Sequence, residues 1–329
     1  MSDVAPVVYS LSDLRTADLP EPRPIIEGLL SEGDTILLVG RPKVGKSRLV
    51  QQATLDLARA QCFLGRFTIP AARRVLLIDL ENRPAGVKAR FGAMSEPHES
   101  DQRVSIYAPE TLAQGAINAT PDGIRYLEGL VTRHTPDVVI IDTWRLFVGG
   151  DENDARVAVD GLKSLSCVRT KRPQLATIVV HHLRKERTND PVKLRNDPYA
   201  WVEAVSGHHA LVGHVDACFG LERELDANRD ELIVFGGVAR SAATSALLLE
   251  EDEQTLRFTV KSGSDAAEAI MTRTELAVWR QARSLPRFTF TVLLKQAKTT
   301  NKKAVSSMLR KAESHGALRK EGSEYVVLP

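Results

Sequence analysis

The eight residues from Gly40 to Ser47 read Gly-Arg-Pro-Lys-Val-Gly-Lys-Ser and fit the pattern G-x-x-x-x-G-K-[ST] at every fixed position. Gly40 and Gly45 allow backbone angles that bring consecutive N–H groups around a phosphate without a Cβ in the way. Lys46 would neutralise the β- and γ-phosphates, and the Ser47 hydroxyl would ligate Mg²⁺. The pattern therefore predicts a site for a nucleoside triphosphate, with ATP and Mg²⁺ as the expected ligands.

The residues on either side of this loop match what such a loop requires. Thr35–Val39 is a short apolar run, long enough for a buried parallel strand. Arg48–Ala60 repeats its apolar residues on one helical face, and a helix there points its positive end at the bound anion. We expect the phosphates to be held by the loop and the start of the helix: Gly40, Arg41, Pro42, Lys43, Val44, Gly45, Lys46, Ser47 and Arg48.

Two further carboxylates stand at the ends of apolar runs. Asp142 ends the run DVVIID, and we predict that it lies beside Ser47 across the sheet and holds the Mg²⁺ water shell. Glu81 directly follows the run RVLLIDL and is predicted to polarise the attacking water. Asp79 competes for that role, but the residue nearer the carboxyl end of a strand lies nearer the nucleotide crevice, which favours Glu81.

Strand and helix patterns alternate through most of the first 260 residues. Ala176–Val180 is a further apolar strand, and Leu232–Phe235 and Leu256–Val260 are typical of later, more antiparallel strands. Fully apolar strands alternating with helices predict an α/β fold with a mostly parallel, twisted sheet covered on both faces.

The pattern changes after residue 262. Thr272–Ala282, Phe290–Gln296 and Asn301–Ser314 read as three short helices, and Leu318–Leu328 reads as a two-stranded ribbon. That order predicts a winged helix, a variant of the helix-turn-helix family. The chain then divides into an N-terminal arm (1–24) that can pack on a neighbouring subunit, a P-loop domain (25–262) and a winged-helix domain (263–329).

Charge is distributed unevenly along the chain. The net charge is only +2, yet residues 261–329 contain 13 Lys or Arg against 6 Asp or Glu, and the first 260 residues are left at −5. A basic terminal domain on a mildly acidic body is the electrostatic pattern of a protein that touches nucleic acid. The third predicted helix, Asn301–Ser314, would be the recognition helix, and its expected DNA contacts are Lys302, Lys303, Arg310 and Lys311.

Several classes of protein are excluded. No basic start precedes an apolar core, and no apolar run approaches the roughly 18–20 residues that span a bilayer, so we expect a cytoplasmic protein without membrane contact. The three cysteines, Cys62, Cys167 and Cys218, are scattered and predict reduced, buried thiols. Nothing supplies the further ligands that a zinc site at Cys218 and His214 would need.

Taken together, these motifs resemble the RecA-like core of RepA-type hexameric helicases and their AAA ATPase relatives. The likeness runs from about Pro24 to Val260. It is carried by Ile26–Leu30, the phosphate loop, LIDLEN with Glu81, IIDTWRLF with Asp142, and VVHHLRK with His181 and His182. The loop departs from the family's glycine-rich norm because Arg41, Pro42 and Lys43 occupy its middle.

The resemblance implies further roles. His182 matches the strand-end residue that senses the γ-phosphate, and residues 183–206 match the channel loop that binds single-stranded DNA. Phosphate contacts in that loop would be Arg184, Lys185, Arg187, Lys193 and Arg195. Arg240 matches the arginine that the family supplies to the γ-phosphate of an adjacent subunit, although the lysine that often stands two residues before it is absent here.

These observations predict an ATP-hydrolysing, DNA-dependent homo-oligomer of helicase or translocase type, most simply a hexameric ring. Single-stranded DNA would pass through its channel, and duplex DNA would meet the winged helix. One alternative is an ATP-switched, DNA-binding regulator or loading factor, associated with replication or mobile elements, that does not unwind DNA. Another is a recombinase-like filament ATPase.

Overall fold

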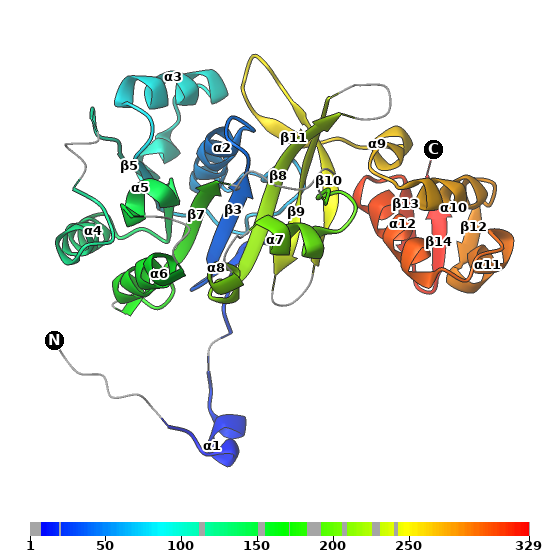
Figure 1. Ribbon diagram of the computed structural model, residues 1–329, viewed down its shortest axis with the longest axis horizontal. Helices are drawn as coiled ribbons and strands as arrows, with labels where there is room; N and C mark the ends of the chain where they lie inside the picture. Colours follow the sequence, from blue (N-terminus) through cyan, green and yellow to red (C-terminus); the bar gives the residue numbers. More distant parts are fainter. Residues whose placement is uncertain are drawn as a thin grey trace.

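The computed structural model describes residues 8–19, 21–111, 116–150, 155–170, 172–182, 192–205, 209–225, 231–239 and 243–328. Its centre is a nine-stranded sheet with the order β11-β10-β9-β8-β3-β7-β6-β4-β5 (Figure 1). The strands are β3 (Thr35–Gly40), β4 (Val75–Asp79), β5 (Val104–Tyr107), β6 (Val138–Asp142), β7 (Ala176–His182), β8 (Ala217–Leu225), β9 (Glu231–Ala239), β10 (Ala243–Glu251) and β11 (Phe258–Val260).

The sheet confirms the predicted α/β class. The strands from β8 through β3, β7, β6 and β4 to β5 run parallel to one another. The strands from β8 through β9 and β10 to β11 are antiparallel, as expected for the later part of the chain. Every residue of β3, β4 and β6 is buried, because a parallel sheet is covered on both faces.

Alternate residues of β3 pack into two separate apolar cores, one on each face of the sheet. Leu37 and Val39 join a core with residues of α4 (Pro121–His134), α5 (Trp144–Val148), α6 (Ala155–Thr170), α7 (Pro198–Val205) and α8 (His209–Gly213). Ile36 and Leu38 join the opposite core, where α2 (Lys46–Arg59) supplies Leu49 and other residues. Since successive side chains of a strand point to opposite faces, a one-residue slip of β3 would exchange the two layers.

Residues 263–328 form a smaller unit with its own core. Its elements are α9 (Ser264–Ala269), α10 (Arg273–Arg283), β12 (Arg287–Thr289), α11 (Phe290–Gln296), α12 (Lys302–Ser314), β13 (Leu318–Glu321) and β14 (Glu324–Val327). The three strands form an antiparallel sheet in the order β12-β14-β13. Trp279, Leu293 and Met308 are fully buried in this core.

The smaller unit packs against β10, beside which it lies in Figure 1. The contact centres on His315, which is 1% exposed. Its Nε2 accepts a hydrogen bond of 2.9 Å from the Leu248 N–H of β10, so its Nδ1 carries the proton and donates to the Lys311 carbonyl oxygen at 2.8 Å.

The N-terminal residues form a short helix, α1 (Leu11–Thr16), and a hairpin of β1 (Pro24–Ile26) and β2 (Leu30–Ser31). None of the helices in the described ranges combines the length and the apolar character that crossing a bilayer requires. The expectation of three buried thiols was wrong for two of them, because Cys62 and Cys167 are exposed and only Cys218 is buried.

Candidate nucleotide-binding site

The phosphate loop joins β3 to α2, and its two fixed glycines are required by the backbone. A Cβ on Gly40 would lie 2.4 Å from the Leu221 carbonyl oxygen of β8. Gly45 has a φ of +112°, a conformation that side-chain-bearing residues rarely adopt, and directly precedes α2. The 14-residue helix therefore begins at the loop, and its unpaired N–H groups face the place where phosphates would sit.

Lys46, the first residue of α2, is only 4% exposed. Its Nζ donates hydrogen bonds to the carbonyl oxygens of Gly40 at 2.7 Å and Arg41 at 2.9 Å. Burial lowers the pKa of Lys46 to about 8, although the charges of Asp142 and Glu81 oppose that shift. The ammonium is therefore held inside the loop and is still mostly protonated at neutral pH.

Asp142 ends β6 and is fully buried. Neither of its carboxylate oxygens makes a hydrogen bond of normal geometry to any described residue. Burial raises its pKa to about 7, the Asp79 charge adds to the shift, and the neighbouring Ser47 side chain and the Lys46 charge oppose it.

A buried carboxylate without a partner is costly unless a cation joins it. Carboxylate and hydroxyl oxygens such as those of Asp142 and Ser47 are the ligands that Mg²⁺ prefers. The donor set therefore fits the predicted metal. In the sheet, β7 lies between β3 and β6. A residue at the end of β7 therefore lies between the phosphate loop and Asp142.

That residue is His182, at the end of β7. Its Nδ1 lies 3.2 Å from Lys46 Nζ, and its Nε2 lies 3.9 Å from Glu81 Oε2. Burial lowers the pKa of His182 to about 4, and the charges of Lys46 and Arg145 add to the effect. The ring is therefore neutral at pH 7. Since an ammonium only donates, Nδ1 accepts from Lys46 and the ring proton is on Nε2, facing Glu81.

Glu81 and Asp79 differ sharply in what surrounds them. Asp79 is fully buried, and its carboxylate accepts hydrogen bonds from the N–H groups of Glu81 and Asn82, from the Asn82 side chain and from Gln51. The Glu81 side chain is 47% exposed and faces His182. Asp79 is thus occupied in shaping the turn after β4, while Glu81 is free to meet a water molecule.

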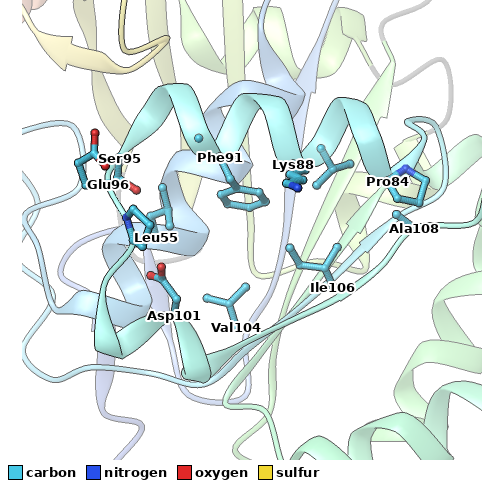
Figure 2. Close-up of a pocket in the computed structure, with 13 residues that line it drawn as sticks. Leu55, Pro84, Lys88, Phe91, Ser95, Glu96, Asp101, Val104, Ile106 and Ala108 are labelled. Atoms are coloured by element: carbon cyan, nitrogen blue, oxygen red, sulfur yellow. The ribbon is translucent and has the colours of Figure 1, made fainter.

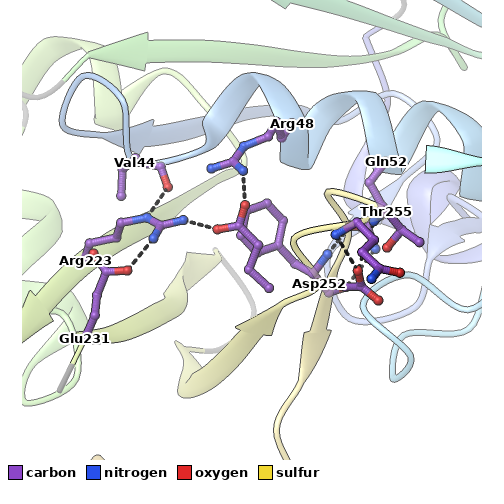
Figure 3. A network of polar contacts seen from close by, with 10 residues as sticks. Val44, Arg48, Gln52, Arg223, Glu231, Asp252 and Thr255 are labelled. Carbon is purple, nitrogen blue, oxygen red and sulfur yellow. Dashed lines mark hydrogen bonds and ion pairs between the residues drawn. The ribbon is translucent and has the colours of Figure 1, made fainter. Parts of the chain in front are cut away.

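A second polar network lies behind the loop and was not expected from the sequence. The Arg223 guanidinium of β8 donates from Nε to the Val44 carbonyl oxygen at 3.1 Å and also pairs with Glu231 of β9 and Glu251 of β10 (Figure 3). Arg48 also pairs with Glu251. The backbone of the loop is therefore tied to the antiparallel half of the sheet.

Arg48 was expected among the phosphate-binding residues. Its guanidinium is engaged with Glu251 and lies 5.5 Å from the centre of the Phe258 ring. A phosphate contact from this position must therefore come from the backbone N–H. Arg223 and Glu251 gave no signal in the sequence, because the loop residues that they contact, Val44 and Arg48, lie 179 and 203 positions away.

The predicted channel loop is only partly described. Arg184, Lys185 and Arg187 lie outside the described residues, and so does Arg240. Lys193 and Arg195 are described, and each has a nitrogen 3.0 Å from a carboxylate oxygen of Glu224, whose side chain is 8% exposed. Arg195 also donates to the Ala269 carbonyl oxygen at 3.0 Å. Both side chains thus fasten their segment to β8, and Arg195 also fastens it to α9.

The predicted DNA contacts on α12 separate into two groups. Lys302, Lys303 and Arg310 are exposed. Lys311 is 3% exposed, and its Nζ donates to Glu275 Oε2 at 2.9 Å and to the Ile270 carbonyl oxygen at 3.0 Å. The prediction that Lys311 contacts DNA was therefore wrong, because its charge is buried and neutralised within the small unit.

Comparisons with known proteins agree with the fold and with the loop. A family model described as "AAA domain" matches residues 6–188, more than half of the 329-residue chain, and spans Lys46, Glu81, Asp142 and His182. Among similar solved structures is a KaiC-like protein from the hyperthermophilic archaeon Pyrococcus horikoshii OT3. It has a TM-score of 0.51 and 14% identity, over 72% of this chain and 93% of that chain, a likeness that concerns the fold alone. A search of curated proteins found no match.

Proposed function

From the premise that this chain belongs to the AAA domain family, we propose that it is a DNA-dependent, oligomeric ATPase of the RepA-like helicase or translocase type. The observation that supports the ATPase most strongly is a pair of buried charges, one at the start of α2 and one at the end of β6. Lys46 and the unpartnered Asp142 lie on two sides of His182, at the edge where parallel strands meet a bound nucleotide.

In this proposal the loop N–H groups and Lys46 bind the β- and γ-phosphates, and Ser47 and Asp142 hold Mg²⁺. The metal would supply positive charge for the phosphate oxygens. Lys46 stabilises the charge that develops on those oxygens, because it is held in a site of low dielectric. Its hydrogen bonds to the loop carbonyls keep it in place before the nucleotide arrives.

Glu81 acts on the water. Its carboxylate accepts a proton as the water oxygen attacks the γ-phosphorus, and the bond from that phosphorus to the β,γ-bridging oxygen breaks with its electron pair leaving on ADP. The Nε2 proton of neutral His182 faces Glu81, and its Nδ1 faces Lys46. His182 therefore lies between the lysine that binds the phosphates and the carboxylate that acts on the water.

The oligomer is proposed to complete the site, with Arg240 reaching the γ-phosphate of a neighbouring subunit. This role has a direct test in mixtures of two inactive variants. Arg240→Ala lacks the arginine and Glu81→Gln lacks the carboxylate, so each alone is inactive. In an equal mixture about a quarter of the subunit interfaces contain both groups, and activity should return to about that fraction. A monomer that hydrolyses ATP at the full rate of the assembly would remove Arg240 from the mechanism.

DNA binding is proposed at two places. The segment 183–206 follows β7 and His182, where a nucleotide-dependent movement can reach it, and Arg184, Lys185 and Arg187 are its proposed phosphate contacts. Residues 263–329 are proposed to be a winged helix. Their order of helices and strands and the exposed Lys302, Lys303 and Arg310 on α12 support that reading.

The proposed motor activity is tested by measuring ATP hydrolysis and DNA unwinding in the same preparation. We expect single-stranded DNA to raise the rate of ATP hydrolysis and forked DNA to be separated in an ATP-dependent way. The same preparation with Lys46→Ala should do neither. If DNA stimulates ATP hydrolysis but the strands of forked DNA do not separate, the protein is not a helicase. It would then be a translocase or an ATP-dependent switch.

A second candidate, an ATP-switched DNA-binding regulator or loading factor, is favoured by one specific observation. Contacts run from Val44 through Arg223 to Glu251 on β10, and directly from Arg48 to Glu251. Leu248 on the same strand bonds to His315 in the small unit. A change at the loop can therefore reach the proposed DNA-binding unit. In this case ATP should change the affinity for duplex DNA, while the strands of forked DNA should remain paired.

A recombinase-like filament would be recognised by particle images with a non-hydrolysable ATP analogue and single-stranded DNA.

A further inference from the structure

One tyrosine is exposed on the surface within the segment that is proposed to bind DNA. Among the large apolar side chains that are exposed in the described ranges, three are aromatic: Tyr9, Tyr126 and Tyr199. Tyr199 is the most exposed of the three, at 55%, and it lies in the first turn of α7. A single exposed aromatic residue is ordinary on a protein surface, so its surroundings decide whether it has a role.

The backbone that carries Tyr199 is fixed to β8 on both sides of this residue. Before it, Leu194 is fully buried, and its N–H donates to Glu222 Oε2 at 2.8 Å. After it, Trp201 is 2% exposed, and its Nε1–H donates to Glu222 Oε1 at 3.2 Å. A Cβ on Gly220 of β8 would lie 2.4 Å from the Trp201 ring, so helix and strand are in close contact. Little backbone freedom would therefore be lost when a ligand covers Tyr199.

A strongly basic part of the small unit comes close to the start of α7. Residues 295–310, which cover the end of α11 and most of α12, contain five Lys or Arg and no Asp or Glu. The Nζ of Lys303, in the first turn of α12, lies 4.0 Å from Asp197 Oδ2, two residues before Tyr199. The side chain of Lys303 is 92% exposed, so this ion pair is weak and leaves the ammonium open to a phosphate.

Tyr199 thus lies where the two proposed DNA-binding places meet. Along the chain it follows the proposed phosphate contacts of the 183–206 segment. Arg195 of the same segment donates to the Ala269 carbonyl oxygen of α9, and both α7 and α12 contact β10 (Figure 1). The segment proposed to bind a single strand is therefore bonded to the unit proposed to bind duplex DNA, and Tyr199 is exposed at that junction.

An apolar groove of about 660 Å³ between α3 (Pro84–Met94) and β5 has a different character (Figure 2). Phe91 of α3 points into this groove. The charged residues that line it are Lys88, Glu96 and Asp101, and Asp101 is already paired with Arg59. The groove therefore offers no surplus of positive charge to a nucleic-acid backbone, whereas residues 295–310 do.

We propose that the Tyr199 ring stacks on one base of a single strand, with the phosphates next to that base held by Lys302 and Lys303. This inference rests on the proposed function and adds a base contact to it. Stacking on a tyrosine requires an unpaired base, because the faces of a base within a duplex are already covered by its neighbours. In forked DNA, the stacked base would lie between the single-stranded part, bound by the 183–206 segment, and the duplex part, bound by the small unit.

The affinity of the full-length protein for a fluorescently labelled single strand of DNA tests this contact, with a non-hydrolysable ATP analogue present. Tyr199→Ala should weaken binding by about five- to hundredfold, which is the effect of removing one stack between a base and an aromatic ring. Tyr199→Phe should bind like the wild type, because the ring and not the hydroxyl makes the contact. Tyr126→Ala, at a 46% exposed ring of α4, is the matched control and should leave the affinity unchanged.

Two comparisons separate stacking from a phosphate contact and from a loss of structure. Because a tyrosine ring releases no counterions, the slope of log affinity against log salt should be the same for the wild type and Tyr199→Ala. The two proteins should also bind equally to blunt duplex DNA and to a strand of abasic nucleotides, since neither offers an unpaired base. A shallower salt slope for Tyr199→Ala, or an equal loss of affinity for all three nucleic acids, would overturn the proposal.

A spectroscopic signal gives an independent measurement. The three tryptophans of the chain, Trp144, Trp201 and Trp279, are at most 2% exposed, so Tyr199→Trp would add an exposed indole to a chain whose own indoles are buried. The fluorescence of this variant should fall when the single strand binds and should not change with the abasic strand.

Failure of this inference can be told apart from failure of the proposed function. A wild type that binds no single strand would reject both the DNA-dependent motor and the stacking contact. Single-strand binding that is equal in the wild type and Tyr199→Ala would reject the stacking contact alone.

Discussion

Two buried lysines, Lys46 and Lys311, invite comparison, because one lies in the large α/β domain and the other in the small C-terminal unit. They are 4% and 3% exposed, and each donates to a carbonyl oxygen. Lys311 also bonds to the carboxylate of Glu275, whereas the other bonds of Lys46 go to a second carbonyl oxygen and a neutral histidine.

The different hydrogen-bond partners of Lys46 and Lys311 give the two lysines different functions. The charge of Lys311 is neutralised within the fold, so it fixes α12 to α10 and leaves nothing for a ligand. The charge of Lys46 is buried without a hydrogen-bonded carboxylate, and burial lowers the pKa of both lysines. A buried ammonium that lacks a carboxylate partner is poised to bind an incoming anion, and this is how a phosphate site differs from a structural ion pair.

The largest expected effect is a difference in the free energy of unfolding between the alanine variants of the two lysines. Lys311→Ala should lower the free energy of unfolding by about 3–5 kcal/mol, because it leaves the Glu275 carboxylate buried and unpaired. Lys46→Ala should cause no loss of this kind, since no carboxylate loses a hydrogen bond. Urea unfolding of both variants measures the difference, with Lys303→Ala, at a 92% exposed side chain, as the control.

A rescue sharpens this result. Combining Lys311→Met with Glu275→Gln removes both charges, keeps an acceptor for the Thr272 N–H at the start of α10, and should recover most of the lost stability. Equal destabilisation by Lys46→Ala and Lys311→Ala would show that the two lysines play the same role.

The next effect concerns the buried carboxylate of Asp142. The pKa of Asp142 is raised from its ordinary value near 4 to about 7, so its contribution to stability is complete below pH 4 and is lost as the pH rises through 7. Asp142→Asn should remove this dependence, which amounts to about 4 kcal/mol at most. Urea midpoints of the wild type and the variant at pH 5 and pH 8 measure it. Parallel pH profiles would contradict the unpartnered state of Asp142.

A smaller effect is expected from the network behind the loop. Arg223→Ala removes the hydrogen bond to the Val44 carbonyl oxygen and should weaken ATP binding by about five- to tenfold, in line with about 1–1.5 kcal/mol for one such bond. Glu231→Gln changes only a 53% exposed partner of the same arginine and should leave the affinity unaltered. Calorimetric titration with ATP distinguishes the two, and equal affinities in both variants would remove Arg223 from the support of the loop.

The smallest effect on folding belongs to the exposed lysines of α12. Lys302→Ala with Lys303→Ala should change the free energy of unfolding by less than about 0.5 kcal/mol. DNA affinity should nevertheless fall, and the slope of log affinity against log salt should become shallower by about 1 for each lost phosphate contact. An unchanged salt slope would show that this face of α12 does not meet DNA.

The sequence predicted the parts of the site that lie on one continuous segment. Gly40, Gly45 and Lys46 have fixed spacing because they shape one turn of backbone, and fixed spacing is visible in a single chain. Asp142 could be placed because it ends an apolar run, and the carboxyl ends of parallel strands meet at one edge.

What the sequence missed depends on partners that are distant along the chain. Strand β8 was not predicted, because Glu222, Arg223 and Glu224 interrupt its apolar start, and each acquires a partner only in the folded sheet. Lys311 was misread for the same reason. The pattern Thr272-x-x-Glu275 was a visible signal of a helix cap, but nothing along the chain showed that the capping glutamate would also bind a lysine 36 positions later.

The most direct test of the account is calorimetric titration of the wild type and Lys46→Ala with ATP in the presence of Mg²⁺. The wild type should bind about one ATP for each subunit, and Lys46→Ala should lose most of that affinity while keeping its wild-type unfolding midpoint. If Lys46→Ala binds and hydrolyses ATP as the wild type does, the buried ammonium is not a phosphate ligand.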